Sequence, residues 1–187
     1  MNKEIKKSVP EVKIKLIKER ARRIFNTNKV TEKNHYKGTI VEDLAKEIDD
    51  SAREINIIVT LDACRMPINY FYVNMGTPDG VSCSMGEIIK TALLSNASKV
   101  IFMHNHPQGG RSFSYGDLTV TAELNCLLSL VGVDLYDSLI VPYGGKINSL
   151  RLDHEDEHRE VMLSYKWEVT KEHSDIFAEI SERIWED

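Results

Sequence analysis

Two apolar runs that lie close together, residues 55–61 and 68–74, constrain the fold most strongly. The first run, Ile-Asn-Ile-Ile-Val-Thr-Leu, is apolar on both of its alternating faces, as a strand in the middle of a covered sheet is. Only residues 62–67 separate the two runs, so the pair predicts a hairpin. A strand that is buried on both faces needs helices above and below the sheet.

The remaining elements are expected around this hairpin. An amphipathic pattern predicts a helix over residues 40–51, and two capping boxes, Ser84 to Glu87 and Ser114 to Asp117, predict the starts of two more helices. The other predicted strands are short and apolar: residues 99–103, 135–141 and 147–150. The sequence therefore predicts an α/β fold, with a mixed central sheet flanked by helices.

Charge is distributed unevenly along the chain, whose net charge is −5. Residues 1–37 contain 12 basic and 4 acidic side chains, whereas residues 153–187 contain 4 basic and 12 acidic ones. We expect three parts: a basic N-terminal strand and loop (residues 1–38) packing on the core, a central domain (39–152), and an acidic helical extension (153–187). The acidic balance argues against general nucleic-acid binding.

The basic arm contains a predicted half-exposed strand, Val12 to Leu16. Its cations are Lys13, Lys15, Lys18, Arg20, Arg22 and Arg23. Few aromatic side chains accompany them, which argues against stacking on single-stranded nucleic acid. Contact with DNA phosphates by Lys and Arg alone would be weak and salt-dependent, so a solvated surface is the favoured explanation. The acidic extension could neutralise this arm, either within one chain or across a homodimer.

Membrane and disulfide-rich classes are disfavoured. No apolar run approaches the roughly 18 residues that a membrane span needs, and the first residues are lysine-rich rather than apolar. The three cysteines, Cys64, Cys83 and Cys126, are odd in number and widely spaced. We expect reduced thiols in a cytoplasmic protein.

The stretch His104-Asn105-His106-Pro107 is the strongest candidate for chemistry. Two histidines at positions i and i+2 on a strand point to the same side, so both imidazoles can reach one ion. Asp117, in the first turn of the next predicted helix, could add an oxygen ligand. Two nitrogens and one carboxylate leave a fourth position for water, as catalytic zinc sites do. Ser114 and Asp117 are also explained as a helix cap alone, and the two roles are compatible.

The spacing His104-x-His106-Pro107-x6-Ser114-x2-Asp117 resembles the JAMM signature of the JAB/MPN metalloprotease fold. The wider stretch from Val12 to about Leu152 is similar to the RadC-like branch of that fold. Further matching positions are Glu54, Leu61-Asp62, Gly76-Thr77, Glu87-Ile88, Ala92, Asn96-Ala97, Gly109, Gly132-Val133, Asp137 and Ser149-Leu150.

This resemblance implies a three-layer, cytidine-deaminase-like fold and a Zn²⁺ ion held by His104, His106 and Asp117. It also implies that Glu54 acts as general base and that Ser114 steadies a developing oxyanion, in the hydrolysis of an amide or isopeptide bond of a protein or peptide substrate. Glu87 is a rival base, but its place in a capping box already accounts for it.

Three positions depart from the family pattern: Gln108 and Phe113 replace a serine and a proline in the loop, and Ser138 replaces a histidine. These changes spare the metal ligands but affect the shape of the loop and substrate preference. Asp137, which precedes Ser138, is expected to order a strand end, and a supporting position beside the zinc is the alternative.

Other functions remain open. A RadC-like accessory protein associated with DNA repair, with a structural or vestigial metal site, is the competing class, and a metal-free interaction module is a third. The segment from His154 to His158 also matches the HExxH pattern of zinc proteases. Acidic residues lie between its histidines, so we interpret it as a solvated helix.

Overall fold

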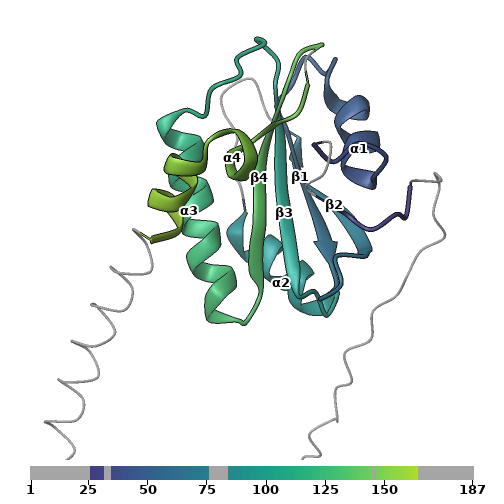
Figure 1. Cartoon of the computed structure of the whole chain (residues 1–187), viewed down its shortest axis with the longest axis vertical. Coiled ribbons are helices and arrows are strands. Elements are labelled where there is room, and N and C mark those ends of the chain that lie inside the picture. Colours follow the sequence, from purple (N-terminus) through teal and green to yellow (C-terminus); the bar gives the residue numbers. More distant parts are fainter. Residues whose placement is uncertain (1–25, 32–34, 76–83, 145, 164–187) are drawn as a thin grey trace, which may run out of the picture.

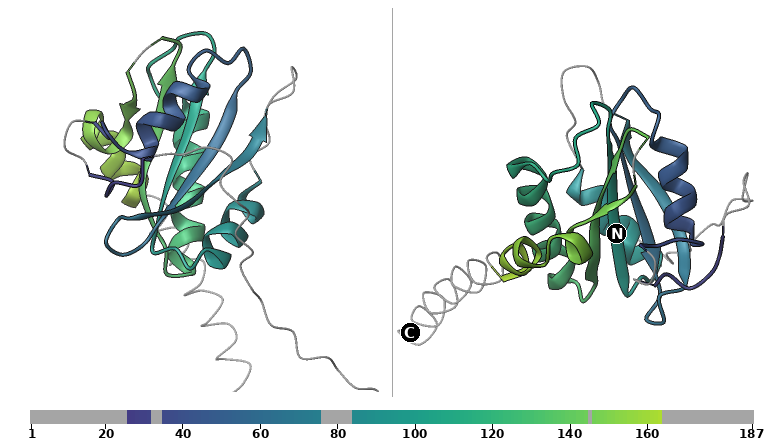
Figure 2. Two further views of the ribbon diagram at one scale, coloured as in Figure 1. Left: turned by 90° about the vertical axis from the view of Figure 1, so that its right-hand side faces the viewer. Right: turned by 45° about the horizontal axis from the view of Figure 1, so that its top comes forward.

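The computed structural model describes residues 26–31, 35–75, 84–144 and 146–163. Their core is one five-stranded sheet with helices on both faces, in three layers (Figures 1 and 2). The strands are β1 (Ile55–Leu61), β2 (Pro67–Met75), β3 (Lys99–His106), β4 (Asp134–Pro142) and β5 (Asn148–Ser149). The helices are α1 (Ile40–Ile48), α2 (Met85–Leu94), α3 (Tyr115–Leu130) and α4 (Leu150–Asp153).

The sheet is mixed, with the strand order β2-β1-β3-β4-β5. β1 is antiparallel to both β2 and β3, and β4 is antiparallel to β5. Only β3 and β4 are parallel, because α3 carries the chain back between them. The predicted hairpin, the position of β1 inside the sheet between two other strands, and the α/β class with a mixed, helix-covered sheet are confirmed.

Two apolar clusters fill the spaces between the layers. On one face, α1 packs on alternate side chains of the sheet, including Ile57, Val59, Ile101 and Met103. On the other face, α2 and α3 pack on the intervening side chains, including Ile58, Val100 and Phe102. The alternation of β3 therefore assigns His104 and His106 to the face of α3, and Asn105 to the face of α1.

Several boundaries differ from the predicted ones. The helix expected to reach Ser51 ends at Ile48, because the chain turns where Ser51 donates its N–H to the carbonyl of Ile48. The strand expected over 147–150 is only two residues long, and α4 replaces its end because the Ser149 hydroxyl caps the N–H of Leu152. β3 is longer than predicted, since it includes both histidines.

The two charged ends are described only in part. The predicted strand from Val12 to Leu16 lies outside the described residues, but Val30 and Tyr36, which follow it, are fully buried against α1 and the sheet. Of the acidic extension, residues 155–163 are helical, and Val161 is buried. The part from residue 164 onward lies outside the described residues.

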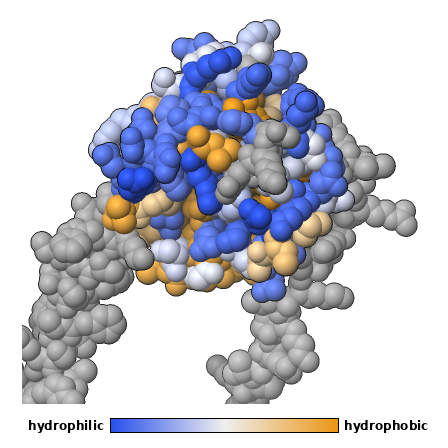
Figure 3. Space-filling view, viewed as in Figure 1, coloured by the Kyte–Doolittle hydropathy of each residue, from blue (hydrophilic) through white to orange (hydrophobic). Residues whose placement is uncertain are grey.

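The described surface is polar on the face seen in Figure 3, where hydrophobic atoms gather only in small patches. Cys64 and Cys126 are free thiols, the first exposed and the second buried, and Cys83 lies outside the described residues. No helix of the described ranges is long and apolar enough to cross a membrane.

Candidate metal centre

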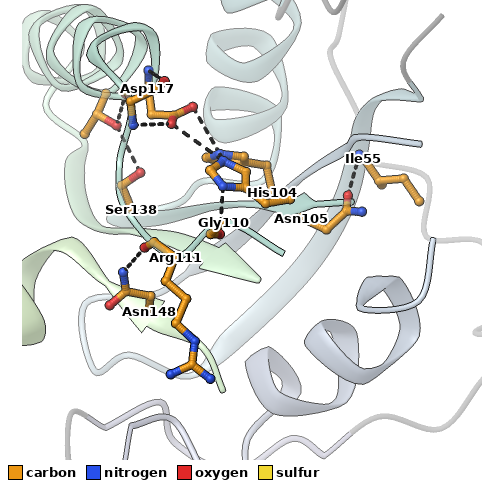
Figure 4. Close-up of polar contacts among 11 residues, drawn as sticks. Ile55, His104, Asn105, Gly110, Arg111, Asp117, Ser138 and Asn148 are labelled. Atoms are coloured by element: carbon orange, nitrogen blue, oxygen red, sulfur yellow. Dashed lines mark hydrogen bonds and ion pairs between the residues drawn. The ribbon is translucent and has the colours of Figure 1, made fainter. Parts of the chain in front are cut away.

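His104, His106 and Asp117 meet where β3 ends and α3 begins (Figure 4). The Nε2 atoms of the two imidazoles are 3.0 Å apart. Nε2 of His104 lies 3.2 Å from one carboxylate oxygen of Asp117, and Nε2 of His106 lies 3.6 Å from the other. Three predicted ligands, two from a strand and one from the following helix, thus converge on one point.

These separations match the donor set of a single small ion. Ligands about 2.0–2.2 Å from zinc at tetrahedral angles lie roughly 3.3–3.5 Å from one another, and the three observed separations bracket this value. The side chain of His104 is 2% exposed, whereas His106 and Asp117 are 21% and 17% exposed. The cluster is therefore closed on the side of the sheet and reachable from solvent on the other.

The loop after β3 fixes the tautomer of His106. Nδ1 of His106 lies 2.9 Å from the carbonyl oxygen of Gly110. A carbonyl only accepts hydrogen bonds, so Nδ1 carries a proton, and Nε2 is the ring nitrogen that faces Asp117 and that could bind a metal ion once it has lost its own proton. Gly109, with φ at +78°, supplies the left-handed turn that brings Gly110 under the ring.

The electrostatics of the cluster keep Asp117 ionised. Burial opposes its ionisation, but hydrogen bonds from His104 and His106 outweigh burial and hold the pKa of Asp117 well below its usual range. The Asp117 carboxylate in turn raises the pKa of His106, and the charge of Glu54 adds to this effect. Nδ1 of His104 is the one buried side-chain polar atom without a hydrogen-bond partner among the described residues.

Ser114 and Asp117 form the predicted capping box. The hydroxyl of Ser114 accepts from the N–H of Asp117 at 3.2 Å, and the carboxylate of Asp117 accepts from the N–H of Ser114 at 2.7 Å. One carboxylate oxygen therefore serves both the helix cap and the ligand cluster. The two interpretations of this motif are compatible, as the sequence suggested.

Asn105 connects β3 to the segment that carries Glu54. Its Oδ1 accepts from the N–H of Ile55 at 2.7 Å, and its Nδ2 donates to the carbonyls of Ser51 and Arg53. Figure 4 shows this side chain directed away from His104, toward Ile55. A fully buried amide thus holds both sides of Glu54 in place.

Glu54 lies just before β1 and is half-buried. Asn56 pairs with His104 in the antiparallel register of β1 and β3. Continued by two residues, this register sets Glu54 opposite His106 and on the same face of the sheet. Its charge acts on the pKa of His106, which agrees with that placement.

Asp137 lies in a buried hydrogen-bond network. It is fully buried, and its carboxylate accepts hydrogen bonds from Tyr36, Ser149, and the N–H groups of Ser138 and Arg151. None of these partners belongs to the cluster of His104, His106 and Asp117. Burial raises the pKa of Asp137, against the effect of the hydrogen bonds from Ser149 and Tyr36. Asp137, in β4, therefore holds β5 and the start of α4 against its own strand.

Other supporting residues were not foreseen. The hydroxyl of Thr121 donates to the carbonyl of Asp117 and lies 3.0 Å from the hydroxyl of Ser138, so β4 supports the first turn of α3. The amide of Asn148 holds the carbonyl of Arg111 in the loop. Two signals were available in the sequence: Ser138 is a departure from the family pattern, and Thr121 lies one turn after Asp117.

The first histidine of the HExxH segment has a structural explanation. Nε2 of His154 lies 3.1 Å from the amide of Asn148, and its ring packs edge-on against Phe113, one of the unusual loop residues. Within the described ranges, His104, His106 and Asp117 are the one group of three histidine, cysteine or acidic residues close enough to share an ion.

Comparison with known proteins gives a consistent assignment. A family model described as RadC-like JAB domain matches residues 34–156. A UPF0758 protein of Cellvibrio japonicus (strain Ueda107) is 37% identical over 101 residues, which are 54% of this chain and 45% of that protein. A UPF0758 protein of Shewanella woodyi (strain ATCC 51908 / MS32) is 30% identical over 122 residues, 62% of this chain and 54% of that protein.

The chain spans about half the length of the curated relatives it matches. The family match begins at residue 34 rather than at Val12, and it continues slightly beyond Leu152. It includes β1, β3, the loop and α3, which together carry the whole candidate centre. The chain belongs to the RadC-like JAB domain family.

Proposed function

We propose that this protein is a zinc-dependent hydrolase that cleaves an amide or isopeptide bond in a protein or peptide substrate. The observation that carries the proposal is the convergence of two imidazole Nε2 atoms and one carboxylate at a point open to solvent. Three protein ligands with an accessible fourth side are typical of catalytic zinc sites, whereas structural sites are closed by four protein ligands.

The chain's own residues prepare this point for a cation. Asp117 is ionised, and the Nδ1–H of His106 is donated to Gly110, so a carboxylate and an imidazole nitrogen both face inward. When bound, zinc supplies a Lewis acid for the substrate carbonyl and lowers the pKa of a water molecule. We assign the role of general base to Glu54, which would take a proton on its carboxylate and return it to the leaving amine.

Ser114 and two exposed aromatic residues support the proposed substrate class. The Ser114 hydroxyl is exposed beside the cluster, where it could donate to an oxyanion while its lone pair caps α3. Tyr115 is 86% exposed next to Ser114, and Tyr143 is 63% exposed just after the end of β4, at the same end of the sheet. Exposed tyrosines are frequent contact residues for bound polypeptides.

The competing function, a DNA-associated accessory protein, stays a prediction. The cations proposed for it, from Lys13 to Arg23, lie outside the described residues. The solvent-open cluster favours the hydrolase, because a structural metal needs no accessible side. A cytoplasmic location and a homodimer likewise stay predictions.

Replacing Glu54 by glutamine is expected to lower hydrolysis by about 100-fold or more, because removal of a general base typically has an effect of this size. The zinc-loaded protein would be incubated with a mixture of peptides and lysine-linked isopeptides, and cleavage scored by mass spectrometry. Zinc content should remain unchanged, since Glu54 is not a proposed ligand.

Glu87→Gln is the matched control, because Glu87 is the rival base and is exposed at the start of α2. Its activity should equal that of the wild type. Equal cleavage by the Glu54→Gln protein would remove Glu54 from the mechanism. A fully zinc-loaded wild type that cleaves none of the substrates would favour the accessory function.

A comparison of Ser114→Ala with Ser84→Ala separates capping from catalysis. Both serines cap a helix through the same hydrogen bond to the third helical residue, so each substitution should lower the free energy of unfolding by about 1 kcal/mol. Only Ser114→Ala should also reduce hydrolysis. Urea unfolding and the peptide assay measure the two effects; an equal loss of activity in both variants would leave Ser114 with a structural role alone.

A further inference from the structure

A concave site lies at the opposite end of the sheet from the metal centre. It is a hollow of about 720 Å³, lined by the β1–β2 turn, the starts of β3 and β4, and parts of α3 and α4. Hollows of roughly 300–1,000 Å³ are typical of small-molecule sites. β3 runs from Lys99 in this hollow to His106 in the metal centre, and α3 runs back from Asp117 to Ser129. Twelve helical residues separate the two sites by about 18 Å.

The hollow concentrates positive charge in an acidic protein. Among the described residues that line it, four are cationic, each from a different segment of the chain: Lys29, Arg65, Lys99 and Arg151. One lining residue is acidic, Asp134, and it pairs with Lys99 at 2.6 Å. Four cations and one anion give a local charge of +3, whereas the whole chain carries −5. Cationic side chains that line a concave surface produce a focused positive potential, which attracts anions.

The two arginines are held in place by Tyr136. The guanidinium of Arg65 donates to the Tyr136 hydroxyl at 3.0 Å, and that of Arg151 donates to the Tyr136 carbonyl at 3.2 Å. Both guanidiniums also lie against the Tyr136 ring, at 5.9 and 4.7 Å from its centroid. A guanidinium carries five donors in a planar fork, so it can hold Tyr136 and a phosphoryl group at the same time.

The backbone of Arg65 has a conformation that favours glycine. Its φ is +68°, in the left-handed region that favours glycine, within a turn closed by hydrogen bonds from Arg65 and Met66 to Asp62. Glycine would occupy this position with less strain. Replacement of Arg65 by glycine therefore removes a cation from the rim of the hollow without straining the backbone.

We propose that this hollow binds a compact soluble anion with two or more phosphoryl groups. The net charge of +3 on these described lining residues, with Lys99 paired to Asp134, exceeds the charge of a single phosphate group, which is about −2. The cations surround a cavity rather than form the extended stripe that would follow a nucleic-acid backbone. Tyr136 is only 5% exposed and packed against two guanidiniums, so recognition is directed to the phosphoryl groups and not to a stacked base.

Calorimetric titration of the full chain with inorganic triphosphate tests this proposal. We expect saturable binding with a Kd on the order of 10–100 µM that weakens as salt is raised, because the contacts are ionic. Triphosphate could also reach a metal ion, so the titration is repeated with the His106→Ala protein. The affinity should be the same, since the two sites lie at opposite ends of the sheet. Loss of binding in that variant would overturn the proposal.

Arg65→Gly removes one cation at a position whose backbone conformation glycine favours, so the protein should stay folded. We expect this variant to bind triphosphate about 10-fold more weakly than the wild type. Arg65→Lys keeps the charge and should bind with intermediate affinity. Lys90→Ala is the control, because Lys90 is exposed on α2 and does not line the hollow. Unchanged affinity in Arg65→Gly would contradict the assignment. Tighter binding of duplex DNA than of triphosphate, lost in the same variant, would replace it with a nucleic-acid site.

Discussion

Replacing His106 by alanine is expected to abolish stoichiometric zinc binding while leaving the protein folded. His106 supplies one of the three converging donors, and its ring is 21% exposed, so its removal opens no closed cavity. Hydrogen-bond partners of metal ligands already contribute about 10–100-fold to affinity, so a lost ligand should weaken binding by at least about 100-fold. Metal analysis of purified, dialysed protein, together with a thermal unfolding curve, measures both parts of this expectation.

The HExxH histidines provide matched controls. His154→Ala and His158→Ala should each retain the zinc content of the wild type, because neither residue belongs to the candidate cluster. A wild-type protein without zinc, or an His106→Ala protein with undiminished zinc, would refute the metal centre. Loss of zinc in both control variants would instead point to the C-terminal pattern.

Asp137→Ala is expected to lower the free energy of unfolding by about 3–5 kcal/mol, because several buried donors are left unsatisfied and each costs about 1–3 kcal/mol. The substitution leaves the hydroxyls of Tyr36 and Ser149 and two backbone N–H groups without their shared acceptor. Unpaired buried donors are costly because they lose water without gaining a partner. Urea denaturation followed by circular dichroism measures the change.

Asp134→Ala is the control on the same strand. Asp134 is exposed and pairs with Lys99 at 2.6 Å, and a surface ion pair contributes only about 0–1 kcal/mol. If the two aspartate variants unfold at the same urea concentration, the network around Asp137 contributes no more to the free energy of unfolding than the exposed ion pair. The Asp137→Ala protein, while folded, should bind zinc normally, because its partners lie outside the cluster.

The elements predicted correctly from the sequence were those specified by nearby residues. The apolar run of residues 55–61 matches the bounds of β1, and Ser84 and Ser114 cap their helices as expected. Such signals act over three or four residues and are readable without the fold. The short helix α4 was not predicted, because the sequence of residues 147–150 also fits a strand.

The candidate cluster was predictable for the same reason, since its residues span only 104–117 along the chain. The residues that surround and support the cluster could not be predicted in this way. Asn105 reaches back about fifty residues to the segment around Glu54, and Tyr36 meets Asp137 from a distance of 101 residues. Hydrogen bonds of this kind depend on how the layers pack, and no local pattern specifies the partner. The sequence therefore could not show that Tyr36 and Ser149 are the partners of Asp137.

The alternation in β3 limits how this strand can change in evolution. His104 and His106 face α3, while Asn105, between them, faces the opposite layer and holds the segment of Glu54. Insertion of one residue ahead of His104 would turn each of these three side chains to the other face of the sheet. The two imidazoles would then leave the metal centre, and the amide would leave the segment of Glu54. We therefore expect β3 to tolerate length changes only in steps of two residues, with single insertions confined to the surrounding loops.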